Sequence, residues 1–354
     1  MALWKEYLMR KILYENRPSL QEERCLNWLQ TRQECHICRD VCPEGVFDGP
    51  EPRWEYCDGC GICAAACPVR CLRPSALTAG SVLELYGRIS GDVVFSCHQR
   101  DDSADLRFTC LSALPWELMA LFALNGRVTL LEGECGDCFR KNSLSVLDKS
   151  LDRLKDFLGE EGYRERICRL SEPAQRDYRA CSRREAFSML FSKSRAAAAG
   201  LLPDSGELVS EGIIWRQLLA HRLRHLAPPR ESGWDIPEFT DRCTACGVCT
   251  RLCPGEALRR IQGEEDEGGV WHMALIPWRC TACGVCTLAC PEEGIKVPEN
   301  RWLTDPSRPV IYSAKLSVCP RCKEPASALN GSKLCPRCAG ELGKAIVWED
   351  MEGG

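Results

Sequence analysis

The sequence lacks any long hydrophobic run, and nowhere does it offer the roughly 18 consecutive apolar residues that a membrane span needs. Residues 1–20 mix charged side chains such as Lys5, Arg10 and Glu15 with apolar ones, so they lack the uncharged core of a secretory signal peptide. No G-x-G-x-x-G or P-loop motif marks a dinucleotide or nucleotide site. Aromatic residues amount to only 7%, and the formal net charge is −4, which disfavours nucleic acid as a partner.

Cysteine, by contrast, is abundant, with 27 in 354 residues. Most of these cysteines stand in C-x2-C clusters, which favours metal binding over the disulfide framework of a small secreted protein. We therefore expect a soluble protein of a reducing compartment, the cytoplasm, without a transmembrane segment. The length of the chain predicts two or three domains.

The most regular cysteine motif lies between residues 243 and 290 and consists of two copies of C-x2-C-x2-C-x3-C-P. Each copy has the spacing that holds a cubane [4Fe–4S] cluster, and its fourth cysteine ligates the other cluster of the pair. The exchange has a geometric cause, because the fourth cysteine stands just before a proline and points away from its own loop. The two expected ligand sets are Cys243, Cys246, Cys249 and Cys290, and Cys253, Cys280, Cys283 and Cys286.

Both copies contain the heptapeptide Thr-Ala-Cys-Gly-Val-Cys-Thr, at residues 244–250 and 281–287. In this repeat the segment closely resembles the bacterial two-cluster ferredoxins. The resemblance covers about residues 235–300 and implies a ferredoxin fold that transfers electrons. Disulfides or zinc on the same eight cysteines are the alternative interpretation.

A second pair of motifs, in residues 35–67, resembles the same module but departs from it in the first half, where Arg32 stands at the position of the first ligand. The exchange rule gives one complete set, Cys42, Cys57, Cys60 and Cys63. The other set, Cys35, Cys38 and Cys67, lacks one ligand. We prefer Cys25 as the missing ligand over Cys71, which we expect to point away, and a three-iron cluster is a third possibility.

Between the two modules, apolar runs at 91–97, 106–110 and 127–131 alternate with helical patterns at 114–124 and 144–158. This alternation predicts a parallel sheet with covering helices, and such sheets bind ligands beyond the carboxyl ends of their strands. Three cysteines close the predicted strands and a fourth opens the next helix, so we expect one site at that edge. Its members are Cys97, Cys110, Cys135 and Cys138.

Cys97, Cys110 and the Gly-Asp-Cys138 turn make residues 90–190 loosely similar to the small iron–sulfur (delta) subunit of methyl-viologen-reducing hydrogenase. Cys135 departs from that family, because it lies only three residues before Cys138. The resemblance implies a [2Fe–2S] cluster, and buried free thiols are the alternative. Two isolated cysteines, Cys168 and Cys181, are interpreted as structural.

The final segment carries two Cys-Pro-Arg-Cys knuckles, at residues 319–322 and 335–338. Four thiolates in two knuckles are typical of a closed zinc ribbon. A rubredoxin-like iron site is the alternative, since the ligands alone do not separate the two metals. The expected ligands are Cys319, Cys322, Cys335 and Cys338.

The expected fold is a multidomain α+β chain in which two ferredoxin-like modules flank an α/β parallel-sheet domain and a zinc-ribbon-like unit follows. The boundaries are 1–80 for the first module, 85–200 for the α/β domain, 201–234 for a helical linker, 235–300 for the second module and 301–354 for the tail. The chain should carry four [4Fe–4S] clusters and one zinc or iron in the tail, and the middle-domain cysteines are the candidate site of one [2Fe–2S] cluster.

The ferredoxin resemblance implies an electron-transfer subunit, a polyferredoxin that relays low-potential electrons between partner oxidoreductases in an anaerobic redox complex. The hydrogenase resemblance implies partners of the hydrogenase, formate-dehydrogenase-like or heterodisulfide-reductase-like kind. Two alternatives stay open: a reductase with its own site at the four middle-domain cysteines, and a regulatory or assembly protein that uses the zinc ribbon. The sequence contains no flavin motif or nucleophile–base pair, so we expect no catalytic residue.

Overall fold

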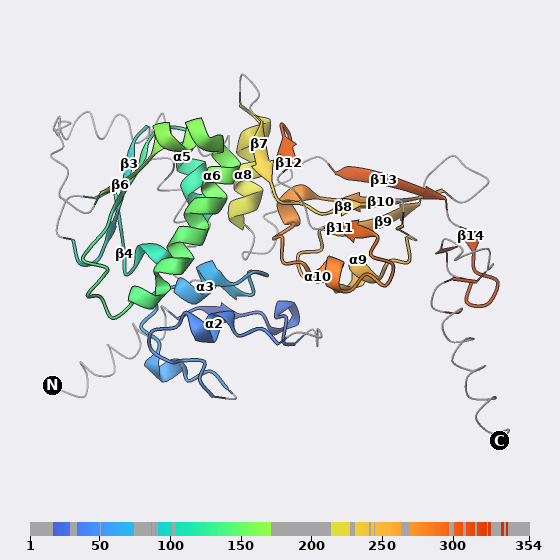
Figure 1. Cartoon of the computed structure of the whole chain (residues 1–354), viewed down its shortest axis with the longest axis horizontal. Coiled ribbons are helices and arrows are strands. Elements are labelled where there is room, and N and C mark those ends of the chain that lie inside the picture. The colour runs from blue at the N-terminus through green and yellow to red at the C-terminus, as the bar shows by residue number, and fades with distance from the viewer. Residues whose placement is uncertain are drawn as a thin grey trace. The chain divides into compact units, whose positions relative to one another are not determined.

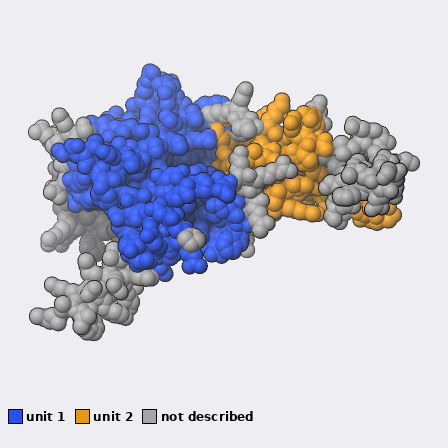
Figure 2. Space-filling model, turned by 60° about the horizontal axis from the view of Figure 1, so that its bottom comes forward, with its two compact units in different colours: residues 1–234, 302–305 blue, residues 235–301, 306–354 orange. Residues whose placement is uncertain are grey.

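The computed structural model forms two compact units, residues 1–234 with 302–305, and residues 235–301 with 306–354 (Figures 1 and 2). Several parts of the chain lie outside the described residues, among them residues 1–16 of the predicted first module, Arg32, Cys181 and residues 201–213 of the predicted linker. The structure describes residues 17–28, 34–49, 51–73, 86, 89, 91–100, 104–170, 214–226, 231–240, 242–243, 245–262, 270–296, 301–306, 309–315, 317–323, 325–326, 334–335 and 338.

A four-stranded parallel sheet lies at the centre of the first unit, in the order β4-β3-β5-β6. All five residues of β3 are buried, as is typical of an inner strand in a parallel sheet. The prediction of a parallel sheet in the middle segment is therefore confirmed, whereas β6, which contains Cys168, was not predicted. The strands are β3 (Val93–Cys97), β4 (Leu106–Phe108), β5 (Val128–Leu131) and β6 (Ile167–Leu170).

The first unit also contains the helices α5 (Trp116–Ala123), α6 (Leu144–Arg166) and α8 (Ile214–Arg224). Helix α5 packs against both α6 and α8 (Figure 1). It is apolar nearly all round, and only its first residue is not fully buried, which is the pattern of a core helix. The backbone of α6 leaves helical geometry at Gly159, where φ is +75°, a conformation that glycine adopts at little cost.

The first ferredoxin-like module belongs to the same unit. Strand β1 (Ser19–Leu20) pairs antiparallel with β2 (Leu72–Arg73), and the short helices α2 (Ile37–Asp40) and α3 (Ile62–Ala66) lie between them in sequence. Helix α3 contacts α6 and the 3₁₀ turn at 111–113 (Figure 1). The module is thus in contact with the end of the sheet at which β4 ends and the turn at 111–113 follows.

Two arginines hold the module against α5 through one buried carboxylate. Glu117, on α5, is only 2% exposed and lies 3.1 Å from Arg70 of the module and 3.3 Å from Arg216 of α8. The guanidinium of Arg216 also lies over the rings of Trp116 and Trp234, at 5.3 and 4.8 Å. Three segments that are distant in sequence therefore meet at this carboxylate.

Residues 302–305 belong to the first unit because β7 (Ser232–Trp234) pairs with β12 (Arg301–Leu303). Ser232 donates a hydrogen bond through Oγ to the Leu303 carbonyl at 3.4 Å. Trp234 is almost fully buried and makes an edge contact with Phe157 of α6.

The second unit contains a three-stranded antiparallel sheet in the order β13-β10-β9 and two short paired strands around the cysteine loops. Strands β9 and β10 pair in antiparallel register. Strand β13 was expected to belong to the tail but extends this sheet. The elements are β8 (Glu238–Phe239), α9 (Val248–Leu252), β9 (Leu258–Gln262), β10 (Val270–Leu275), α10 (Val285–Leu288), β11 (Ile295–Lys296), β13 (Val310–Lys315), β14 (Ser317–Val318) and β15 (Pro325–Ala326).

Within the described ranges, no helix combines the length and the apolar character that crossing a bilayer requires.

Replacing Glu117 with Gln should destabilise the first unit, because it removes the buried negative charge that Arg70 and Arg216 both contact. Removing one partner of a buried pair costs on the order of 3 kcal/mol, and at about 2–4 °C per kcal/mol the thermal midpoint should fall by about 6–12 °C. The matched control is Glu160→Gln, which removes a solvent-exposed partner of Lys155 and Arg164 and should leave the midpoint unchanged. Equal midpoints for the two variants in calorimetry would contradict the docking role of Glu117.

Candidate metal centres

The two cysteine loops of the second unit have the same backbone geometry. Gly247 and Gly284 precede α9 and α10 with φ of +78° and +76°, in the left-handed region that favours glycine. Thr250 and Thr287 donate hydrogen bonds from Oγ to the carbonyls of these glycines, both at 2.7 Å. The repeated heptapeptide therefore folds into the same local structure twice.

The fourth cysteine of each half lies with the first three cysteines of the other half. Burial raises the pKa of Cys249 to about 12, and the neighbouring Cys243, Cys246 and Cys290 raise it further in the same direction. In the other half, burial is again the main cause of a raised pKa at Cys286. Its next neighbours, which also line one pocket with it, are Cys280, Cys283 and Cys253.

We call the fourth cysteine of each half, which lies with the cysteines of the other half, the crossing cysteine. Backbone N–H groups donate hydrogen bonds to the sulfurs of both crossing cysteines, Cys253 and Cys290. The N–H of Ala257 lies 3.2 Å from Sγ of Cys253, and the N–H of Gly294 lies 3.1 Å from Sγ of Cys290. Such bonds favour the thiolate and, at an iron–sulfur centre, help to set the reduction potential.

In each of these ligand groups, an ion pair joins the segment that follows the crossing cysteine to the segment just before the first cysteine of the other half. Arg279, next to Cys280, lies 3.3 Å from Glu256, and Arg242, next to Cys243, lies 2.7 Å from Glu293. The carboxylates are largely exposed, and exposed pairs contribute about 0–1 kcal/mol each. These ion pairs therefore orient the loops more than they stabilise them.

In the first unit, one pocket collects the complete set of the N-terminal module. Trp54 and Phe47 form part of its wall, and their rings meet edge to face at 5.7 Å. Burial raises the pKa of Cys60 to about 12, so this thiol stays protonated at neutral pH until a metal displaces the proton. The cysteines that line the pocket are Cys42, Cys57, Cys60 and Cys63.

The incomplete set contains five thiols where four were expected. Burial, followed by the proximity of Cys35, Cys67 and Cys25, raises the pKa of Cys38 to about 11. Cys71 was expected to point away, but its Sγ lies 3.3 Å from Sγ of Cys67, and it is buried. Hydrogen bonding by Cys71 is the main cause that lowers the pKa of Cys25 and of Cys67 to about 6.

The middle-domain cysteines gather at the carboxyl edge of the parallel sheet. Cys97 ends β3, Cys110 follows β4, and Cys135 and Cys138 follow β5. The pKa of Cys135 is raised by burial, then by Glu132, and then by the three other cysteines. Strands β3 and β5 flank the point at which the strand order reverses, which is where such sheets bind ligands.

One detail of this site, the position of Cys138, differs from the sequence-based expectation. Cys138 does not open a helix, because a 3₁₀ turn at 141–143 precedes the start of α6 at Leu144. Cys168 lies inside β6, opposite Thr129 of β5, and so belongs to the sheet rather than to its edge loops.

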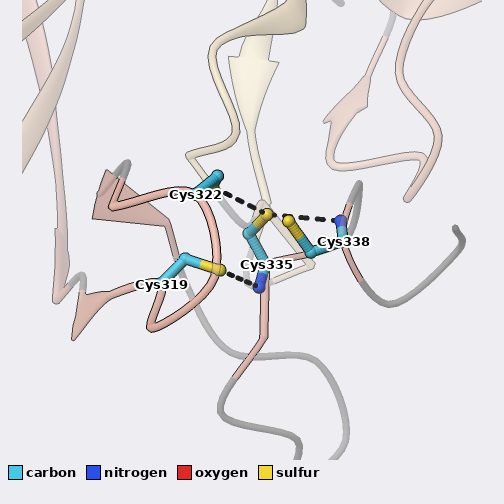
Figure 3. Close-up of side chains that lie close together, drawn as sticks. All are labelled: Cys319, Cys322, Cys335 and Cys338. Atoms are coloured by element: carbon cyan, nitrogen blue, oxygen red, sulfur yellow. Dashed lines mark hydrogen bonds between the residues drawn. The ribbon is translucent and has the colours of Figure 1, made fainter. Parts of the chain in front are cut away.

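The tail cysteines form a tight group in which the four Sγ atoms lie within 4.8 Å of one another (Figure 3). Backbone N–H groups of Cys322 and Cys335 lower the pKa of Cys319 to about 6, and the N–H of Cys335 lies 3.3 Å from its Sγ. Burial, by contrast, raises the pKa of Cys338 to about 12. Four converging sulfurs at this spacing fit one tetrahedral metal ion.

The comparisons with known proteins agree with the two ferredoxin-like modules. A family model described as a 4Fe-4S dicluster domain matches residues 242–293, and a 4Fe-4S binding domain model matches residues 50–73. Pyruvate synthase subunit PorD of Methanothermobacter marburgensis is 38% identical over 58 residues, which are 16% of this chain and 63% of that protein. The chain thus spans 63% of the length of this relative.

The chain therefore contains 4Fe-4S ferredoxin-type domains at two positions. The resemblance to two-cluster ferredoxins is confirmed at this level. Sequence reasoning missed the position of Cys71, for which the only available signal was its place four residues after Cys67.

Replacing Gly294 with Ala should disturb the crossing ligand, because the added Cβ would lie 2.7 Å from Cα of Cys243 and 2.8 Å from its nitrogen. Backbone atoms cannot move aside as a flexible side chain does, and overpacking of this kind costs about 1–3 kcal/mol. We expect the purified variant to contain less iron and to have a lower thermal midpoint than the wild type.

The matched control is Gly49→Ala, whose Cβ would meet only the Glu51 carbonyl at an ordinary 3.4 Å. It should retain the wild-type iron content. Wild-type iron and midpoint in Gly294→Ala would show that the loop adjusts without cost.

Proposed function

We propose that this chain is a polyferredoxin subunit that relays low-potential electrons between partner oxidoreductases. The observation that supports the proposal is a turn that follows each of the four crossing cysteines, Cys42, Cys67, Cys253 and Cys290. Three residues beyond each one, the backbone has a positive φ and its N–H donates to the carbonyl of that cysteine. The residues are Gly45, Arg70, Glu256 and Glu293, with φ of 60°, 54°, 51° and 51°.

Three of these four positions hold a residue other than glycine, and such residues adopt a left-handed conformation only when the surroundings require it. The turn also occurs after Cys42, in the half whose first ligand position holds Arg32. This supports the same two-cluster architecture in both modules. When bound, the [4Fe–4S] clusters supply one-electron redox chemistry at potentials on the order of −400 mV.

The proposed ligand sets follow the grouping of the thiols. In the N-terminal module, we assign Cys25 to the set of Cys35, Cys38 and Cys67, because Cys25, Cys35 and Cys67 all raise the pKa of Cys38. The remaining sets are Cys42, Cys57, Cys60 and Cys63; Cys243, Cys246, Cys249 and Cys290; and Cys253, Cys280, Cys283 and Cys286.

At the sheet edge, Cys97, Cys110, Cys135 and Cys138 would hold a [2Fe–2S] cluster. Their convergence from three strand ends is the support for this assignment. In the tail, Cys319, Cys322, Cys335 and Cys338 would hold one zinc ion, whose role is to stabilise a segment with little apolar core of its own.

The residues of the chain bury and orient these sites. The thiols are mostly buried or half-buried, so water has little access to the sulfurs, and N–H groups of Ala257 and Gly294 donate to two of them. Partner proteins would be other redox subunits, of the hydrogenase, formate-dehydrogenase-like or heterodisulfide-reductase-like kind. PorD is by its name a subunit of pyruvate synthase, which supports a place for this chain inside an oxidoreductase complex.

Metal analysis of anaerobically prepared protein should give about eighteen irons and one zinc per chain, corresponding to four cubanes, one [2Fe–2S] cluster and one ribbon. Acid-labile sulfide should match the iron. A value of about sixteen irons would leave the middle domain without a cluster, and about eight would exclude one whole module.

The fifth thiol near the N-terminal module allows a direct test of the ligand set. Cys25→Ser should remove the iron of one cubane, about four per chain, or convert it to a three-iron cluster, whereas Cys71→Ser should retain the full iron content. Cys168→Ser, inside β6, is the control for cysteine loss as such. Retention of iron in Cys25→Ser together with loss in Cys71→Ser would reverse the assignment.

A further inference from the structure

Arg140 is a buried arginine beside two groups of cysteines. Only 7% of its surface is exposed, and two of its nitrogens, Nε and Nη1, have no hydrogen-bond partner within the described residues. A guanidinium has five N–H donors, and leaving buried donors unsatisfied is costly. The surroundings of Arg140 therefore call for a further acceptor.

One side of Arg140 meets a cysteine loop of the N-terminal module. Its Nη2 donates to Oδ2 of Asp58, the residue between Cys57 and Gly59. Asp58 in turn accepts the N–H of Cys60 through Oδ1 at 3.0 Å. The carboxylate thus joins the guanidinium directly to the loop that carries Cys57 and Cys60.

The other side of Arg140 belongs to the sheet-edge site. Its own N–H lies 3.4 Å from Sγ of Cys138, and its carbonyl accepts a hydrogen bond from Ser143 Oγ at 2.7 Å. The same Oγ lies 3.9 Å from Sγ of Cys110. Arg140 is therefore built into the turn that forms this site.

Arg140 keeps its positive charge next to both cysteine groups. Burial lowers its pKa, but the hydrogen bond to the Asp58 carboxylate outweighs burial, and the net pKa is raised. The docking of α3 against α6 and against the turn at 111–113 places the two groups in one rigid neighbourhood (Figure 1).

We propose that Arg140 is a positioning residue shared by two redox sites, which couples the N-terminal cluster of Cys42, Cys57, Cys60 and Cys63 to the sheet-edge cluster of Cys97, Cys110, Cys135 and Cys138. The proposal rests on the proposed function. The free Nε–H and Nη1–H groups donate to the sulfur of these clusters. An electron then passes directly between the two clusters. One cluster is oxidised and the other is reduced, and no bond forms or breaks.

The direction of the electrostatic effect follows from charge. Reduction adds negative charge to a cluster, so a nearby cation stabilises the reduced form and raises the potential, whereas a carboxylate lowers it. Arginine rather than lysine suits this position because its rigid fork can donate in several directions at once.

The test is potentiometry monitored by EPR on the full, anaerobically prepared chain, with iron content checked for each variant and dithionite as reductant. Cys110→Ser identifies the sheet-edge signal by abolishing it. Arg140→Gln should lower the potential of both the sheet-edge cluster and one N-terminal cluster. We expect at least a tenfold change in the ratio of reduced to oxidised cluster, which is 59 mV for a one-electron couple.

Asp58→Asn should shift the N-terminal potential in the opposite direction, because it removes the negative charge and leaves the cation. Arg140→Lys should fall between wild type and Arg140→Gln, since it keeps the charge and loses the fork. The matched control is Arg164→Gln, which removes a solvent-exposed arginine of the same unit that pairs with Glu160. It should leave all potentials unchanged.

Opposite shifts for Asp58→Asn and Arg140→Gln, with Arg164→Gln silent, support the proposal, since a merely structural role would not change the sign. If the sheet-edge signal exists but Arg140→Gln matches Arg164→Gln, the inference about Arg140 is wrong and the proposed function stands. If no signal disappears in Cys110→Ser, the sheet-edge cluster itself is excluded. Should Arg140→Gln lose iron, Asp58→Asn and Arg140→Lys decide the question by the same criteria.

Discussion

Burial of thiols in loops too short to form a core is the constraint on which both ferredoxin-like modules depend. Their helices have four or five residues, and the strands that pair around the cysteine loops (β1 with β2 and β8 with β11) have only two, so these loops remove little apolar surface from water. Burial raises the pKa of Cys60 and Cys249 to about 12, and in the absence of metal such thiols remain protonated. Metal binding exchanges those protons for strong bonds, so for such modules the binding free energy is also folding free energy.

The α/β domain solves the same problem by ordinary means. Helix α5 is almost entirely buried, and β3 is buried along its whole length, so this segment has an apolar core that needs no metal. It also gives the N-terminal module a rigid support through Glu117, whose carboxylate is shared by Arg70 and Arg216. A stable sheet can therefore present its edge loops next to a module that relies on its cysteines.

Much of the fold could be predicted because its signals are local. The spacing of the cysteines and the repeated heptapeptide predicted the two modules, and the alternation of strands and helices predicted the parallel sheet with cysteines at its edge. Strand β13 was assigned to the tail because nothing in its own sequence reveals that it pairs with β10. Cys71 was placed wrongly because its contact with Cys67 depends on how the chain turns after Pro68.

The sequence by itself determined the shape of the cysteine loops, since a C-x2-C-x2-C loop is shaped by its own backbone and glycines such as Gly247 and Gly284 permit it. Only the tertiary structure decided that Asp58 meets Arg140, 82 residues away, and that Glu117 meets Arg70 and Arg216. Contacts of this kind arise when separately formed segments dock, and docking depends on the shape and charge of whole surfaces. A local pattern of residues does not show the shape or the charge of such surfaces.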